Sequence, residues 1–375
     1  MDALTTPLPK AWQKVRLGDI GKPCMCKRVM KHQTTPYGEI PFYKIGTFGN
    51  TADAFISKKL FLEYKTKYSF PKKGDILISA SGTIGRAVIY DGKPAYFQDS
   101  NIVWIDNDET LVKNDFLFYV YSNIKWNTEH TTILRLYNDN FRNTLIPLPP
   151  LNEQIAIANV LSGLDRYLYS LDALILKKES VKKALSFELL SQRKRLKGFN
   201  QAWQRVRLGD IANYLTSNLS AEQITQQGKI KVYDVNNFIG YTNTTFISDK
   251  PYISIVKDGS VGRVRILPPK TNILSTMGAL IANHKTTTEF LFYLLSNFDF
   301  KNFTSGSIIP HIYFKDYKEK TISLPSLNEQ IAIANILSGL DNEIISLKNK
   351  KRQFENIKKA LNHDLMSAKI RVLKK

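Results

Sequence analysis

The sequence contains little cysteine and histidine and no long apolar run. Its only cysteines, Cys24 and Cys26, form one C-x-C pair, and no second pair follows that could complete a zinc site or a disulfide framework. The five histidines show no ligand spacing either, so we predict no metal site. No stretch approaches the roughly 18 apolar residues of a membrane span. The first residues also lack the basic-then-apolar layout of a signal peptide, and we expect a cytoplasmic protein.

Positive charge, in contrast, is abundant. The chain of 375 residues has a net charge of +20, and its hydrophobic content of 43% is sufficient for folded cores. Its length predicts two or three domains. The excess is spread along the chain, because the segments 12–146, 147–202, 203–322 and 323–375 each carry four to six more basic than acidic residues. Such a distribution favours a long polyanionic partner such as duplex DNA.

Two segments of the sequence occur twice. WQKVRLGDI at 12–20 returns as WQRVRLGDI at 203–211, and LNEQIAIANVLSGLD at 151–165 returns as LNEQIAIANILSGLD at 327–341. The blocks between these anchors are only weakly similar; for example, SGTIGR in the first faces DGSVGR in the second. Simple drift after a gene duplication would not preserve one segment while scrambling its neighbour. We therefore predict two domains of one fold with diverged surfaces.

Each copy of the LNEQ segment continues in a helical pattern. Apolar residues recur in steps of three and four, which is typical of a coiled-coil seam. After Ile175 the first seam is expected to slip and to resume at Val181, Leu185 and Leu189. About 40 residues per helix give a length of about 60 Å. The helices either pack against each other or pack separately on their own domains. The seam residues are Leu161, Leu164, Leu168 and Leu171 in the first copy and Leu337, Leu340, Ile344 and Leu347 in the second.

Basic residues occupy the other faces of both helical segments. Most of them are expected to be solvated, and a minority could approach phosphate groups or partner proteins. They are Lys177, Lys178, Lys182, Lys183, Arg193, Lys194 and Arg195 in the first segment and Lys348, Lys350, Lys351, Arg352, Lys358 and Lys359 in the second.

The order of these segments resembles that of the specificity subunit of type I restriction–modification enzymes. The resemblance covers nearly the whole chain and rests on the motif L-P-x-L-x-E-Q-x-x-I-A, present as LPPLNEQIAIA and LPSLNEQIAIA, and on the W-x-x-V-x-L-G-D-I opening of each half. It implies an α+β protein with an internal pseudo-twofold repeat. Residues 1–146 and 203–322 would be target-recognition domains of mixed α/β type with curved, strand-rich sheets, and residues 147–202 and 323–375 would be helical spacers.

The resemblance also implies a function. Each domain would bind one half of a split, asymmetric site in double-stranded DNA, and the helices would form an antiparallel coiled coil that sets the distance between the halves. The partners would be two adenine-specific methyltransferase subunits and, in the complete enzyme, ATP-dependent restriction subunits. No cofactor is expected in this chain, since S-adenosylmethionine, ATP and magnesium would belong to the partners.

Candidate DNA-contacting residues lie in glycine-containing turns and polar connections. Hydroxyl groups suit phosphate contacts, arginine can donate twice to guanine, and amides can read adenine. Alternatively, the turns are purely structural, and so is the histidine. The segments 131–140 and 303–316 supply part of the set. The candidates are Ser81, Thr83, Arg86, Arg135, Tyr137 and Asn138 in the first block and Asn236, Asn237, Ser260, Arg263, Arg265, His311 and Lys315 in the second.

The sequence lacks the motifs of the partner activities. An adenine methyltransferase would show (N/D)-P-P-(Y/F), whereas the prolines here read LPPL and LPPK. No G-x-x-x-x-G-K-(S/T) phosphate loop occurs either. We therefore predict a non-catalytic DNA-recognition subunit. The alternatives are a stand-alone DNA-modifying enzyme with an unrecognised active site and a two-domain nucleic-acid-binding scaffold.

Overall fold

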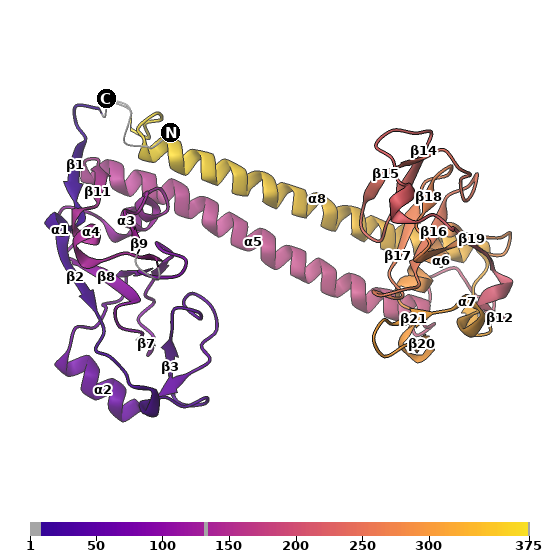
Figure 1. Cartoon of the computed structure of the whole chain (residues 1–375), viewed down its shortest axis with the longest axis horizontal. Coiled ribbons are helices and arrows are strands. Elements are labelled where there is room, and N and C mark those ends of the chain that lie inside the picture. Colours follow the sequence, from indigo (N-terminus) through magenta and orange to yellow (C-terminus); the bar gives the residue numbers. More distant parts are fainter. Residues whose placement is uncertain (1–8, 131–133, 374–375) are drawn as a thin grey trace. The chain divides into compact units, whose positions relative to one another are not determined.

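The computed structural model describes residues 9–130 and 134–373 (Figure 1). Its contacts divide the chain into two compact units. Unit 1 contains the residues up to Leu171 and those from Lys350 onward, and unit 2 contains Asp172–Asn349. Each unit therefore combines one α/β domain with parts of both helical segments. Over the described ranges, no helix has the length and apolar character required to cross a membrane.

The main sheet of unit 1 is four-stranded and antiparallel. Its central strands have both faces covered, since Ile76 and Ile78 belong to one apolar cluster and Leu77 to another. Alternation along a strand explains this division. In spatial order the strands are Gly21–Met25 (β2), Ile102–Asn107 (β8), Ile76–Ser79 (β5) and Ala87–Ile89 (β6).

Shorter elements complete unit 1. A three-stranded sheet contains Phe55–Ile56 (β4), Ile40–Tyr43 (β3) and Tyr96–Phe97 (β7), of which β3 and β7 are parallel. The remaining strands pair as β1 with β11 and β9 with β10: Gln13–Arg16 (β1), Leu145–Leu148 (β11), Glu129–His130 (β9) and Leu134–Arg135 (β10). The helices are Leu17–Ile20 (α1), Lys31–Gln33 (η1, 3₁₀), Lys58–Lys67 (α2), Asn114–Tyr121 (α3) and Asn138–Asn143 (α4).

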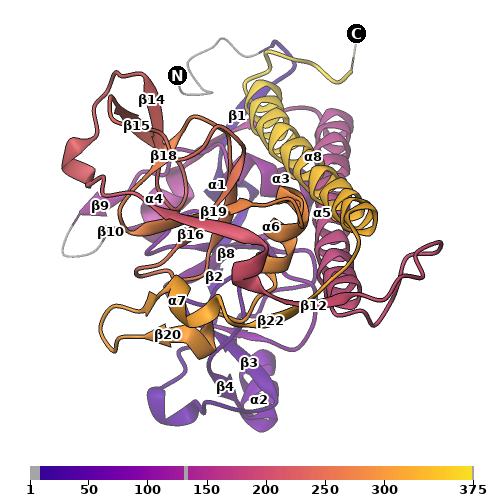
Figure 2. The same ribbon diagram turned by 90° about the vertical axis from the view of Figure 1, so that its right-hand side faces the viewer.

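Unit 2 repeats this plan, as the predicted duplication requires. Its four-stranded sheet contains, in order, Ala212–Thr216 (β13), Met277–Ala282 (β19), Tyr252–Val256 (β16) and Val264–Leu267 (β17). Its three-stranded sheet contains Phe238–Thr242 (β15), Ile230–Tyr233 (β14) and Asn272–Ile273 (β18), and again its last two strands are parallel. In Figure 2, strands β14, β15 and β18 and strands β16 and β19 of this unit are labelled.

Most of the other elements of unit 2 also have equivalents in unit 1; η4 has none among the described residues. Strand Gln204–Arg207 (β12) pairs with Thr321–Leu324 (β22), and Thr304–Ser305 (β20) pairs with His311–Ile312 (β21). Helix α2 of unit 1 has no counterpart among the described residues of unit 2. The helices are Leu208–Asp210 (η2, 3₁₀), Ala221–Gln223 (η3, 3₁₀), Thr288–Ser296 (α6), Lys301–Phe303 (η4, 3₁₀) and Phe314–Tyr317 (α7).

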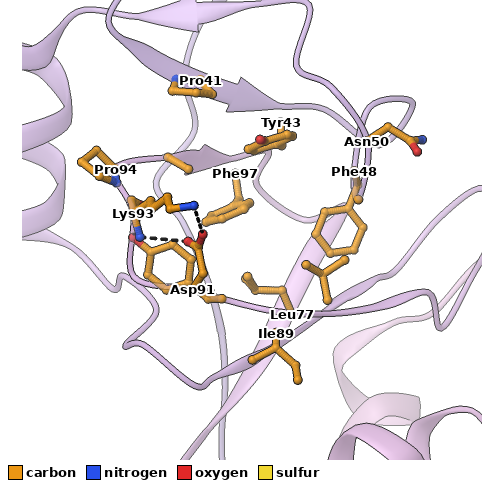
Figure 3. A pocket seen from close by; sticks show the side chains of 14 residues that line it. Pro41, Tyr43, Phe48, Asn50, Leu77, Ile89, Asp91, Lys93, Pro94 and Phe97 are labelled. Atoms are coloured by element: carbon orange, nitrogen blue, oxygen red, sulfur yellow. Dashed lines mark hydrogen bonds and ion pairs between the residues drawn. The ribbon is translucent and has the colours of Figure 1, made fainter. Parts of the chain in front are cut away.

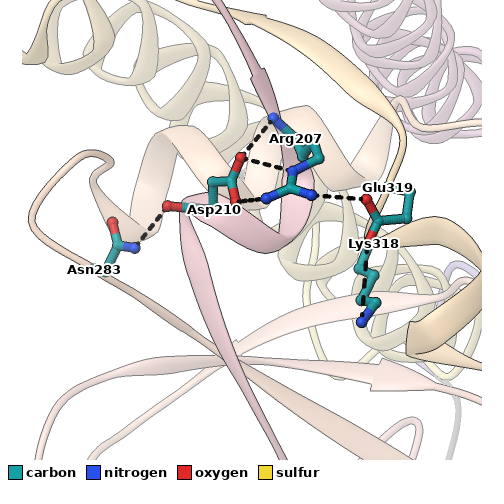
Figure 4. Close-up of polar contacts among 5 residues, drawn as sticks. All are labelled: Arg207, Asp210, Asn283, Lys318 and Glu319. Atoms are coloured by element: carbon teal, nitrogen blue, oxygen red, sulfur yellow. Dashed lines mark hydrogen bonds and ion pairs between the residues drawn. The ribbon is translucent and has the colours of Figure 1, made fainter.

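The repeated W-x-x-V-x-L-G-D-I motif closes each domain. In unit 2, β12 pairs antiparallel with β22, the strand that ends the domain, and the Gly209 amide donates to the Lys318 carbonyl at 2.8 Å. Arg207 then donates to both carboxylate oxygens of Asp210 (3.1 and 3.0 Å) and to Glu319 (3.1 Å) (Figure 4). The bonds from Arg207 hold the pKa of Asp210 below its usual value. Strands β1 and β11 make the same closure in unit 1.

The repeated LNEQ motif anchors the long helices Leu151–Leu190 (α5) and Leu327–Met366 (α8) to their domains. Gln154 is fully buried and donates to the carbonyls of Leu111 (3.0 Å) and Pro149 (2.9 Å). The equivalent Gln330 is also fully buried and donates to the carbonyls of Lys285 and Pro325. A buried amide without these partners would be costly, which explains why glutamine occupies this position in both copies.

Within each unit, a part of α5 lies antiparallel to a part of α8. In unit 1, Asp165 pairs with Lys358, and the rings of Tyr167 and Phe354 lie 4.7 Å apart. In unit 2, Lys178 donates to Glu343 at 2.8 Å, and Lys182 pairs with Asp341. In both units the partner numbers fall as the α5 numbers rise. These contacts confirm the predicted antiparallel coiled coil.

The predicted slip in the first seam is wrong. Leu161, Leu171, Leu337 and Ile344 are buried as expected, and the other four predicted seam residues are half-buried. Of the positions where the seam was expected to resume, Leu189 is buried and Leu185 is half-buried, but Val181 is 45% exposed. The spacing of three and four continues without interruption through Lys178 and Lys182, which reach the facing helix and form ion pairs there. Charge pairing therefore replaces apolar packing at these two seam positions.

Lys182 belongs to one of two equivalent hydrogen-bond networks, one in each unit. Asp341 of unit 2 accepts from Lys182 and from the hydroxyl of Tyr293 (2.8 Å). Asp165 of unit 1 accepts in the same way from Lys358 and from Tyr119 (2.7 Å). Burial first, and the neighbouring carboxylate second, raise the pKa of both tyrosines. Several basic residues that the sequence places on solvated faces therefore bind the two helices together.

Most substitutions lower the free energy of unfolding, but removing one buried hydroxyl in unit 1 is expected to raise it. The Tyr121 hydroxyl is fully buried and has no hydrogen-bond partner in the described part of the chain, and burial raises the pKa of this group. Tyr121→Phe removes an unsatisfied polar atom, so the free energy of unfolding should rise by about 1 kcal/mol in urea titrations. Tyr119→Phe, which removes a satisfied hydroxyl, should lower it by a similar amount. A loss of stability in Tyr121→Phe would contradict the assignment.

Candidate nucleic-acid interface

In unit 1, three segments that are distant in sequence meet beside the turn 81–86. Ser81 and Arg135 form an isolated antiparallel bridge, and both donate to the side-chain oxygen of Asn101, at 2.8 and 3.2 Å. Ser81 is buried, whereas Arg135 is half-exposed. The shared acceptor fixes the guanidinium group while leaving other N–H donors available. The structure thus brings together two of the predicted residues and adds Asn101, which sequence reasoning missed.

A basic pocket lies beside this group. It has a volume of about 490 Å³, and Arg135 and Asn101 form part of its wall. Arg28, Lys31 and Lys44 also line it, and the first and last of these are paired with Asp99 and Asp53. A concave surface with several cations is suited to a polyanion.

The backbone conformation of the turn 81–86 requires glycine at position 85. Gly85 has a φ of +83°, and a Cβ there would lie 2.1 Å from the indole nitrogen of Trp126, so glycine is required. Thr83 is exposed. Arg86 donates to the Phe48 carbonyl at 2.8 Å, and Phe48 lines a second pocket. The prediction that Arg86 contacts DNA is untested, and this arginine has a structural role as well.

That second pocket is aromatic and was not anticipated from the sequence. It has a volume of about 430 Å³, and Figure 3 shows Tyr43, Phe48 and Phe97 on its walls. The rings of Tyr43 and Phe97 are stacked with centroids 5.8 Å apart. Asp91 at the rim accepts from the Lys93 amide (2.9 Å) and pairs with its ammonium group (3.3 Å). The residues that line it come from segments far apart in the sequence, so no local sequence pattern predicts this pocket.

Unit 2 has a different pair at the place of Ser81 and Arg135. Asp258 and His311 form the equivalent isolated bridge, and Nδ1 of His311 lies 2.7 Å from Oδ1 of Asp258. The backbone frame around the pair is the same in both units: the amide of Leu136 donates to the carbonyl of Ala80, and that of Ile312 to the carbonyl of Lys257. The frame is kept while the side chains differ in charge and hydrogen-bonding pattern.

The remaining candidates of unit 2 fall into two groups. Ser260 and Arg263 are exposed in the turn 258–263, and the guanidinium group of Arg263 has no hydrogen-bond or ion-pair partner among the residues described. Arg265 donates to the Asn236 carbonyl at 2.8 Å and lies 5.3 Å from the centre of the Tyr233 ring. The backbone amides of Asn236 and Asn237 donate to the carboxylate of Asp234 in a tight turn. The side chains of both asparagines are exposed.

The last candidates occupy equivalent helix starts. Tyr137 precedes α4, and its equivalent Tyr313 precedes α7; they are 38% and 49% exposed. Asn138 and Lys315 lie in the first turns of these helices and are exposed, and the Lys315 ammonium lies 5.5 Å from the centre of the Tyr313 ring. Sequence reasoning missed Tyr313, although aligning RLY with HIY would have found it. Residues 131–133 of the candidate segment lie outside the described residues.

Comparisons with known proteins agree on one family. The family described as "Type I restriction modification DNA specificity domain" matches residues 9–178 and 200–356. The Haemophilus influenzae protein named "Putative type I restriction enzyme specificity subunit S.HindORF215P" is 63% identical over 148 residues, which are 39% of this chain and 38% of that protein. The MjaVIII specificity subunit of Methanocaldococcus jannaschii is 26% identical over an alignment that covers 97% of this chain and 94% of that one.

A solved structure has the same fold. The type I restriction–modification S subunit from M. genitalium superposes with a TM-score of 0.65 at 20% identity, covering 98% of this chain and 99% of that one. A second structure, from a study of complex assembly and conformational transition in a type I system, gives a TM-score of 0.57 at 15% identity, covering 96% and 99%.

Proposed function

The chain belongs to the type I restriction–modification DNA specificity family, and from this membership we propose that each of its two domains binds one half of a bipartite, asymmetric site in duplex DNA. The main support is that the two units have the same backbone bridge at equivalent positions but carry different side chains on it. Arg135, beside the buried Ser81 in unit 1, and the Asp258–His311 pair in unit 2 place different donors and acceptors at equivalent points. Two such surfaces would read two different base sequences.

The partners we propose are two adenine-specific methyltransferase subunits and, in the complete enzyme, ATP-dependent restriction subunits. Support comes from apolar residues exposed at equivalent points of the two long helices. Leu151 and Leu327 are 40% and 44% exposed, and Ile155 and Ile331 are 46% and 47% exposed. Leu151 and Ile155 are four residues apart and therefore lie on one face of α5. Leu327 and Ile331 lie on one face of α8 for the same reason. Two matched surfaces of this kind suit two copies of one partner.

In this proposal the chain recognises DNA and performs no catalysis. S-adenosylmethionine, ATP and magnesium would bind to the partner subunits, and the complex would work where the DNA is, in the cytoplasm. The comparisons support the specificity function and favour neither a stand-alone enzyme nor a general scaffold.

Mapping methylated adenines in DNA from the source cell tests the proposal. We expect a split, asymmetric motif that disappears when the coding sequence of this chain is deleted, because the chain supplies the specificity of the complex. Restoring the chain should restore the same motif. A short palindromic motif, or methylation that persists without the chain, would contradict the proposal.

A further inference from the structure

Two neighbouring isoleucines are exposed at the end of the β20–β21 hairpin in unit 2. Ile308 is 91% exposed and Ile309 is 55% exposed, and Pro310 follows them. Single exposed apolar residues are ordinary, but two adjacent large ones on a projecting hairpin are typical of a binding surface. The hairpin lies at the periphery of its unit, as the β20 and β21 labels in Figure 1 show.

The hairpin holds these side chains in a defined place. Thr304 and Ser305 pair with Ile312 and His311, and the Gly259 amide donates to the Pro310 carbonyl at 2.9 Å. Gly306 has a φ of +90°, and a Cβ there would lie 2.3 Å from the Ile309 carbonyl oxygen. The apolar tip is therefore fixed to the turn 258–263, the same turn that carries Asp258.

The surroundings of the tip favour DNA as its occupant. The rings of His311 and Tyr313 are nearly parallel at 21°, and Lys315 lies over the Tyr313 ring. Arg263 is exposed on the adjacent turn. Apolar side chains can contact stacked bases, while the surrounding cations and hydrogen-bonding groups can contact phosphates and base edges. This combination of groups is therefore complementary to duplex DNA.

We propose that Ile308, with Ile309 beside it, is a wedge that inserts between neighbouring base pairs of the DNA held by unit 2 and unstacks that step. The inference rests on the proposed function and adds a mechanical action to it. Aliphatic side chains inserted in this way open and kink duplex DNA. Unstacking near the target would also ease extrusion of the adenine that a partner must methylate.

The test uses the full chain, alone and with its modification subunits, on duplexes that carry the mapped site. 2-Aminopurine is placed at each position of each half-site in turn. We expect its fluorescence to rise several-fold at one step of the half-site held by unit 2. Ile308→Ser should abolish this rise and weaken binding by about tenfold, whereas Ile308→Leu should preserve both. Both variants should keep the unfolding midpoint of the natural chain, because this side chain is exposed.

The outcomes separate the wedge from the proposed function. Specific binding without a fluorescence rise would overturn the wedge and leave the function standing. A rise that persists in Ile308→Ser when the chain is measured without its modification subunits would also overturn it, because the unstacking would then not depend on this side chain. A failure of the natural chain to prefer the mapped site would instead count against the proposed function itself.

Discussion

Replacing Glu153 with alanine is expected to lower the free energy of unfolding by about 3 kcal/mol. Glu153 is 2% exposed in the first turn of α5, where its charge also favours the helix N-terminus. Its carboxylate accepts from the Trp12 indole (3.0 Å) and from Nε and Nη2 of Arg371, the latter at 2.8 Å. Alanine would leave the buried indole N–H unpaired and the guanidinium without its partner. The side chain of Arg371 is 32% exposed and can reach water, so we expect the lower end of the range for broken buried pairs.

The second repeat supplies the matched control. Glu329 accepts from Trp203 (2.9 Å) and from Arg195 (2.7 Å) in the same arrangement, but Trp203 is only half-buried. Glu329→Ala should therefore destabilise somewhat less than Glu153→Ala. Guanidinium denaturation of the full chain, followed by tryptophan fluorescence, measures both. Equal and small losses, below about 0.5 kcal/mol, would show that neither carboxylate holds its helix to its domain.

These contacts show where sequence reasoning succeeded. The repeats predicted two equivalent domains and two antiparallel helices because identical segments must have identical surroundings. The same logic could have gone further. Trp12, Glu153 and Arg371 each recur, as Trp203, Glu329 and Arg195, and residues that recur together are candidates for contact. Their separation of 141 and 218 residues in the chain hides the contact from any local pattern.

The failures also have physical reasons. Assigning the seam by hydrophobicity selected Val181, while the uninterrupted helical phase placed Lys182 there, and an ion pair with Asp341 made that position favourable. At the candidate interface, glycine spacing located both turns. It did not show that Arg86 bonds to the Phe48 carbonyl or that Asn101 orients Arg135, since those partners come from loops that are distant in the sequence.

Arg135→Ala is expected to weaken binding at one half-site by about 10- to 100-fold, the effect of losing one arginine contact to a base. The guanidinium group donates to Asn101 at 3.2 Å, which orients it, and Arg135 is half-exposed. Its other N–H donors can therefore contact a base. His311→Ala should act on the opposite half-site, because His311 occupies the equivalent place in unit 2.

Competition binding with duplexes altered in one half at a time distinguishes direct reading from general attraction. If Arg135 reads a base, its alanine variant should tolerate changes in one half and still discriminate in the other, and the His311 variant should show the reverse pattern. If it contacts only phosphate, affinity should fall equally for all sequences and the dependence on salt should weaken. Loss of discrimination in the same half by both variants would contradict the assignment of one half-site to each unit, because the two side chains belong to different units.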